Sequence, residues 1–192
     1  MTAAEMFAQL DNDPEYQAVR AAKDRELAQI AEERRREQEP LLSDLAEVGV
    51  VVDWIGQLLE LPAPDESIYP ILLDHITRPY RPWLLEWIGR AFGHRSARRV
   101  VWDQLLDLIR THALKERAAE GVMVAISEMA RPEDTPTLID LLSDPSLGRS
   151  RIFLVRNLMR SKRQEARTAL LRNQADPDLT KEISARLSQS RS

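Results

Sequence analysis

Histidine and cysteine carry much of the metal and acid–base chemistry of proteins, and this chain holds few of them. Its 192 residues include three histidines and no cysteine. His75, His94 and His112 show neither a paired-histidine spacing nor the H-E-x-x-H pattern of helical zinc sites. We therefore expect no metal site and no catalytic residue, and we interpret each histidine as a surface or turn residue.

Sequence patterns that bind nucleotides or activate a nucleophile are also missing. Phosphate loops, dinucleotide fingerprints and nucleophile elbows all need glycines at fixed positions. The chain has only six glycines, and none of these patterns occurs in it. The sequence thus predicts a protein that is not an enzyme and that uses no cofactor.

Three acids recur at one interval, each after two apolar residues. The triplets 72–74, 105–107 and 138–140 end in Asp, and 171–173 is a degraded copy, so the interval is 33 residues every time. Such a period is typical of stacked supersecondary units. Equivalent positions of packed helices lie roughly 10 Å apart, which is too far for these acids to share a metal ion. We interpret them as solvent-facing or as partners of arginines.

The recurrence predicts an all-α fold, an alpha-alpha superhelix with about four to five helical pairs forming a solenoid. Apolar residues at helical spacing, bounded by Gly and Pro, mark the helices. Pro40 is expected to restart the chain into an irregular first pair, residues 41–48 and 53–59. The regular pairs are expected at 69–76 with 83–92, 97–109 with 114–129, 135–142 with 148–159, and 163–172 with 179–187.

The segment before Pro40 has the pattern of a long charged helix. Asp13 followed by Pro14 is a helix start, because the Asp side chain accepts from free backbone N–H groups and proline suits the first helical position. We predict a helical extension at 1–39 and a repeat domain at 40–192. The sequence leaves open whether the extension packs on the repeats, and it leaves the oligomeric state open.

Several segments of the repeat domain resemble HEAT repeats, the helix-turn-helix units of armadillo-like superhelices. These segments are 69–76, 87–93 and 137–142, and the resemblance extends over about residues 41–187. It implies a stand-alone bacterial HEAT-like protein. In this family the second helix of each pair usually lines the concave face. The resemblance therefore implies a partner-binding surface formed by Arg81, Glu86, Arg90, Arg117, Glu120, Arg151 and Arg156.

Charge is unevenly distributed along the chain, although the net charge is only −4. Residues 41–77 hold seven acids and no Lys or Arg, whereas 78–117 hold nine basic and four acidic residues. Residues 118–144 hold six acids and one Arg, and 145–172 hold eight basic residues and one Glu. Either neighbouring helical pairs attract one another, or the two basic stretches receive an acidic partner.

Aromatic side chains gather in one region. Tyr80, Trp83, Trp87 and Trp102 lie close in sequence and are accompanied by arginines. Because Trp83 and Trp87 share a helix face, they either fill the core or anchor a partner, as Trp, Tyr and Arg often do at interfaces.

Composition and the implied family favour a cytoplasmic binding protein. No apolar run is long enough to span a membrane, and residues 1–13 lack the order of a signal peptide. The first hypothesis is a scaffold or adaptor that grips a protein in its groove, and an immunity protein that neutralises a toxin domain is one form of it.

Two alternatives come from other functional classes. Some HEAT-like proteins are similar to DNA glycosylases, so a nucleic acid could contact stretches 78–117 and 145–172 through its phosphates. The sequence pI near 5.5 opposes this. The other alternative is an enzyme accessory such as the HEAT-like bilin lyases, but no chromophore-binding signal is visible.

Overall fold

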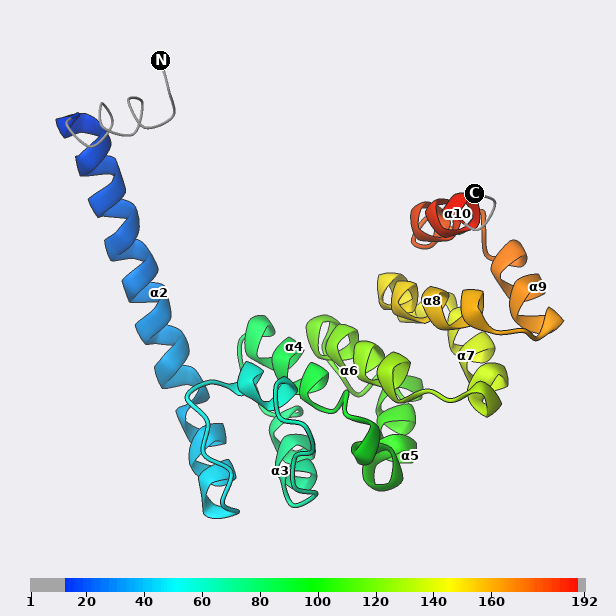
Figure 1. Cartoon of the computed structure of the whole chain (residues 1–192), viewed down its shortest axis with the longest axis horizontal. Helices are drawn as coiled ribbons and strands as arrows, with labels where there is room; N and C mark the ends of the chain where they lie inside the picture. The colour runs from blue at the N-terminus through cyan, green and yellow to red at the C-terminus, as the bar shows by residue number, and fades with distance from the viewer. Residues whose placement is uncertain (1–12, 190–192) are drawn as a thin grey trace. The chain divides into compact units, whose positions relative to one another are not determined.

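The computed structural model describes residues 13–189, and this part of the chain is built from helices, without a strand (Figure 1). The α-helices are α2 (Pro14–Glu47), α3 (Ile68–His75), α4 (Pro82–Ala91), α5 (Arg98–Arg110), α6 (Glu116–Met129), α7 (Thr135–Leu142), α8 (Ile152–Arg160), α9 (Gln164–Arg172) and α10 (Thr180–Gln189). Short 3-10 helices are η1 (Ile55–Leu59), η2 (Arg95–Ala97), η3 (Pro132–Asp134) and η4 (Pro145–Arg151). Within residues 13–189, no helix combines the length and the apolar content that a membrane span requires.

The chain divides into two compact units, residues 1–40 and 41–192. The first twelve residues of the predicted extension 1–39 lie outside the described part. The expectation that Pro40 would restart the chain is wrong, because α2 continues through it. Proline removes one backbone donor from a helix, and Pro40 is exposed, so water can satisfy the carbonyl oxygen that loses its partner.

The described part of the first unit is an exposed, highly charged helix. The Asp13 carboxylate accepts hydrogen bonds from the backbone N–H groups of Glu15 at 2.9 Å and Tyr16 at 3.3 Å. This confirms the predicted helix start. The apolar residues Val19 and Leu27 of this helix remain 64% and 53% exposed, so within this unit they are not part of a core.

The second unit contains the hydrophobic core, which begins with the last turns of α2. Leu41 and Leu45 are fully buried there. Gly49 then takes a positive φ of 84°, which an L side chain disfavours, and the helix ends as predicted. The helix expected at 53–59 is the short 3-10 helix η1, and the Gln57 side chain accepts from the Asp53 backbone N–H at 2.6 Å.

The remaining helices lie close to their predicted positions. The prediction for 135–142 coincides with α7, and the bounds of α3, α4, α5 and α9 differ from prediction by one residue at each end or less. The helix expected at 148–159 is wrong at its start. Gly148 has a positive φ of 56° and a non-helical conformation inside η4, and the regular α-helix begins only at Ile152.

Second helices of the expected pairs pack against one another in series. Helix α4 packs on α6, α6 on α8, and α8 on α10 (Figure 1). The closest approach joins α4 and α6, where a Cβ added at Gly121 would lie 2.2 Å from the Glu86 carbonyl oxygen. A Cβ at Gly89 would lie 2.7 Å from the Val122 backbone nitrogen. Two glycines therefore allow these helix backbones to touch.

Candidate functional site

Four of the seven predicted binding residues lie together and neutralise one another. Glu86 and Arg90 of α4 are joined at 2.9 Å, and Arg117 of α6 reaches Glu120 at 2.7 Å. Arg117 also lies 3.6 Å from Glu86, which links the two helices. The Glu120 carboxylate, with Glu86 farther away, raises the pKa of Arg117. The two positive and two negative charges balance, so this cluster presents little net charge to a partner.

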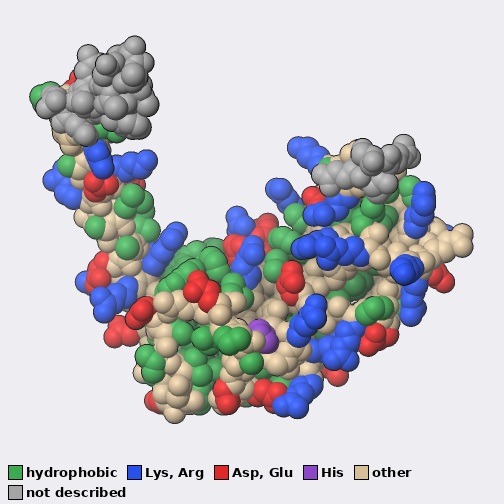
Figure 2. Space-filling model, viewed as in Figure 1, with side chains coloured by type: hydrophobic (Ala, Val, Ile, Leu, Met, Phe, Trp, Pro, Cys, Tyr) green, Lys and Arg blue, Asp and Glu red, His purple; other side chains and the backbone are tan. Residues whose placement is uncertain are grey.

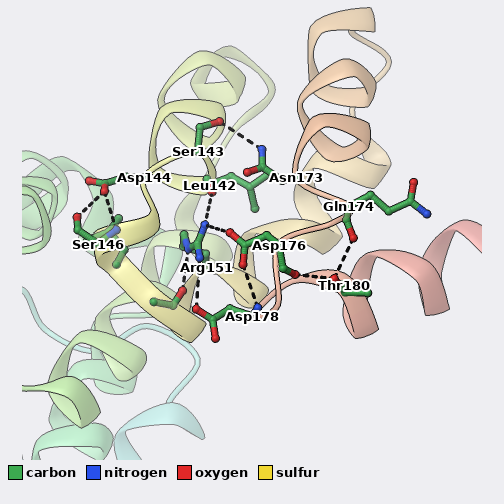
Figure 3. Close-up of polar contacts among 12 residues, drawn as sticks. Leu142, Ser143, Asp144, Ser146, Arg151, Asn173, Gln174, Asp176, Asp178 and Thr180 are labelled. Atoms are coloured by element: carbon green, nitrogen blue, oxygen red, sulfur yellow. Dashed lines mark hydrogen bonds and ion pairs between the residues drawn. The ribbon is translucent and has the colours of Figure 1, made fainter.

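Arg151 does not belong to an accessible binding surface, contrary to the expectation. Its side chain is 1% exposed. The guanidinium donates to the carbonyl oxygens of Gly148 at 2.7 Å and Leu142 at 3.1 Å, and to Asp176 at 2.8 Å (Figure 3). Asp178 lies 3.5 Å away. Arg151 therefore ties the end of α7 to the loop before α10.

The loop that receives Arg151 is itself hydrogen-bonded. The other carboxylate oxygen of Asp176 accepts from the Asp178 backbone N–H at 2.9 Å, and the Thr180 hydroxyl donates to carbonyl oxygens of the same loop (Figure 3). The hydrogen bond from Arg151 lowers the pKa of Asp176. This arrangement holds a charged pair in place and is structural.

The last two predicted residues, Arg81 and Arg156, are exposed. Arg81 is the residue before α4, where its extended backbone starts the helix. Arg156 points from α8 and forms no salt bridge among the described residues. Of the seven predicted residues, Arg156 is the one that lies on an uncompensated basic surface.

The two basic stretches have different environments. In 78–117, the basic groups that pair with acids include Arg78, Arg90, Arg98, Arg99 and Arg117. In 145–172, Arg151 has acidic partners, whereas the other seven basic residues form no salt bridge within the described chain. Lys and Arg side chains gather over the region of α7 to α9 (Figure 2). These seven residues are Arg149, Arg156, Arg160, Lys162, Arg163, Arg167 and Arg172.

A pocket of about 540 Å³ opens in this basic region. Its lining comes from η2, the end of α6, the segment joining α6 to η3, helices α7 and α8, and the turn between α8 and α9. Glu128 is the acidic residue in this lining. The basic residues that line it are Arg95, Arg131, Arg156, Arg160, Lys162 and Arg163. We call this site the basic pocket.

Hydrogen bonds between neighbouring segments fix the polar walls of the basic pocket. The Asn157 amide donates to the Ser127 carbonyl oxygen at 2.6 Å, and the Ser127 hydroxyl donates to the Phe153 carbonyl oxygen at 2.9 Å. The Thr135 hydroxyl donates to the Pro132 carbonyl oxygen at 2.8 Å and lies 3.4 Å from the Ser161 hydroxyl. The wall is therefore formed before any ligand arrives.

The tryptophans pack mainly on the core. Trp83 and Trp87 are half-buried against it, and Trp87 meets Trp54 edge-on with ring centroids 4.9 Å apart. The guanidinium of Arg98 lies 4.0 Å from the Trp102 ring centre, which is a cation–π contact. These contacts favour the core-filling interpretation over a partner anchor.

The interpretation of His75 as a surface or turn residue is wrong, since its side chain is fully buried. One ring nitrogen lies 2.8 Å from Asp44 and the other 2.8 Å from the Tyr80 hydroxyl. His94 and His112 do lie in turns. Among the described residues, no three His, Asp or Glu side chains come together in a way that could hold a metal ion.

A scan against protein-family models found no match to this chain, and searches of curated proteins and of solved structures found none. The resemblance of segments 69–76, 87–93 and 137–142 to HEAT repeats therefore stays a prediction from the sequence. Sequence reasoning named Arg156 individually, and its two basic stretches contain the other cations of the basic pocket except Arg131, but it did not predict that they line one pocket. The density of cations in 156–163 was a signal, whereas the approach of Arg95 and Arg131 depends on tertiary packing.

Proposed function

We propose that this chain is a non-enzymatic protein-binding module, a HEAT-like solenoid whose partner is another protein with an acidic surface. The observation that carries the proposal is the set of seven basic residues in 145–172 that have no acidic partner within residues 13–189. Elsewhere the arginines are largely neutralised by the chain itself. An adaptor or a cytoplasmic bacterial immunity protein that blocks a toxin domain fits this description.

Unpaired surface charge supports binding more than it supports stability. Exposed salt bridges contribute little to folding, and like charges close together repel one another. A partner with complementary charge gains speed of association and specificity from such a surface. The serial packing of α4, α6, α8 and α10 also supports a repeat scaffold, because repeats stacked in line present one extended face.

Nucleic acid is the alternative partner, and one observation favours it: unpaired arginines suit phosphate groups. Acids of the chain pair with at least five of the nine basic residues in stretch 78–117, so a phosphate backbone would contact mainly 145–172. The pI of about 5.5 further opposes a nucleic-acid protein. We therefore place an acidic protein ahead of it.

The test is recovery of a stoichiometric partner from the native cell, followed by affinity measurement with charge-reversal variants. Arg156→Glu combined with Arg167→Glu should weaken the complex by at least about 100-fold and reduce its salt dependence. Arg110→Glu with Lys181→Glu is the matched control, because both residues are exposed and lie outside 145–172.

The control variant should keep the affinity of the original chain within about threefold. Equal affinity of both double variants would remove 145–172 as the docking surface. Random duplex DNA that binds more tightly than the recovered protein, with a steep loss in salt, would replace the proposal by the nucleic-acid alternative.

A further inference from the structure

The basic pocket has features that an extended docking face does not need, since it is concave and its cations come from separate segments. We propose that it binds a small ligand that carries two adjacent phosphoryl groups, as in a diphosphate or a diphosphate ester. This site goes beyond the proposed protein-binding function, because the isolated chain would bind the ligand without its partner.

Charge gives the first argument. Six basic side chains and one acid, Glu128, line the basic pocket. Arg131 lies 3.8 Å from Glu133, whereas the other five cations form no salt bridge among the described residues. One carboxylate would neutralise a single cation. A diphosphate carries several negative charges on neighbouring oxygens, so it matches this excess better.

The type of cation gives the second argument. Five of the six basic residues are arginines, whose planar guanidinium groups donate two parallel hydrogen bonds to phosphate oxygens. Arg156 and Arg160 lie one turn apart on α8, so they share a face of that helix. Arg95 and Arg163 approach from η2 and from the start of α9. A ligand in the pocket would therefore be contacted from more than one side.

Size and rigidity give the third argument. A volume of about 540 Å³ lies in the range of about 300–1,000 Å³ typical of small-molecule sites. A diphosphate occupies part of this space, and the remainder suits an organic group beside the buried Leu138. The Ser127–Asn157 and Thr135–Pro132 hydrogen bonds hold the wall in place, which lowers the entropic cost of binding.

The experiment is calorimetric titration of the full chain with inorganic pyrophosphate, at constant ionic strength maintained with sodium chloride. We expect a 1:1 complex with a dissociation constant on the order of 10 µM and a rise in melting temperature with pyrophosphate concentration. Sulfate at the same ionic strength serves as the anion control and should bind at least about tenfold more weakly.

Variants distinguish the pocket from general basicity. Arg160→Ala with Arg163→Ala should weaken pyrophosphate binding at least about tenfold. Arg149→Ala with Arg172→Ala removes the same charge from exposed positions of 145–172 outside the pocket lining, and should bind as the original chain does. Circular dichroism checks that each variant keeps its helices.

Two results would overturn the proposal. One is pyrophosphate binding no tighter than sulfate binding at equal ionic strength. The other is an equal loss of affinity in both double variants, which would show a diffuse basic surface and no built site. Neither result affects the protein-binding proposal, since that depends on partner recovery without added phosphate.

Discussion

The arginines of this chain have two kinds of environment that sequence does not separate. Arg151 and Arg156 lie five residues apart in the same basic stretch, yet Arg151 is buried and Arg156 is exposed. At about 3.6 residues per helical turn, positions that are five residues apart face different directions. Arg151 also sits just before α8, where its guanidinium meets the carboxylate of Asp176. Burial of one arginine therefore depends on a loop 25 residues away.

Replacing the buried arginine tests its structural role. Arg151→Met replaces the charged side chain by an apolar one of similar length, and it removes the hydrogen bonds to Asp176 and to the two carbonyl oxygens. We expect a loss of about 2 kcal/mol in the free energy of unfolding, below the cost for a fully buried pair, because the Asp176 side chain is still 17% exposed and can be hydrated. Urea denaturation measures this, and Arg149→Ala should change it by less than about 0.5 kcal/mol.

The same pair predicts a pH dependence of stability. The pKa of Asp176 is lowered below its ordinary value of 3.8 in the folded state, so the unfolded chain binds a proton more readily. The stabilisation from Asp176 is present above pH 3.8 and is lost as the pH falls through the lowered pKa. Unfolding free energies between pH 2 and 5 should therefore vary less in Arg151→Met. Identical pH profiles for both chains would contradict this role of Arg151.

Buried His75 offers a second residue-scale prediction. Tyr80→Phe removes the hydroxyl that lies 2.8 Å from one His75 ring nitrogen and leaves that nitrogen without a partner. The expected loss is about 1 kcal/mol, measured by urea denaturation. Tyr16→Phe is the matched control because Tyr16 is 38% exposed. An unchanged free energy of unfolding in Tyr80→Phe would mean that water replaces the hydroxyl as the partner of His75.

The sequence predicts the positions of most helices in the second unit. It fails at those helix ends that are set by the local backbone conformation. The helices α3 to α7 and α9 follow apolar spacing and clear Gly or Pro boundaries, so their positions could be predicted. The prediction of a break at Pro40 failed because an exposed proline removes one helical hydrogen bond without ending the helix. The start of α8 was missed because a positive φ at Gly148 depends on the local turn.

The contact between α4 and α6 is the element-scale feature with the clearest test. Alanine at position 121 should raise helix propensity by up to about 1 kcal/mol, but its Cβ would collide with the Glu86 carbonyl oxygen. The cost of this collision should exceed the gain in helix propensity, with a net loss of about 2 kcal/mol in the free energy of unfolding. Gln104→Ala, at an exposed position of α5, is the control. A stabilised Gly121→Ala would show that the two backbones do not touch.

Across the whole chain, alternating charge serves two purposes. Contacts such as Arg99 with Glu66 and Arg98 with Asp134 join segments 33 and 36 residues apart, so part of the alternation holds neighbouring helical pairs together. Stretch 145–172 keeps an excess that nothing in the described chain neutralises. The excess of basic residues in both stretches is visible in the sequence, but only the tertiary structure shows which of these residues pair with acids of the same chain.

The division into two units predicts that the second folds without the first. A fragment of residues 38–192 keeps about one helical turn before Leu41, together with the core that Leu41 and Leu45 begin. It should unfold cooperatively, with the urea dependence expected for its size. Leu45→Ala in this fragment should cost about 2–5 kcal/mol, because the side chain is fully buried. Val19→Ala in the full chain is the control, since Val19 is 64% exposed. A fragment without cooperative unfolding would show that residues before 38 are needed for the core, and the two units would then have to be treated as one.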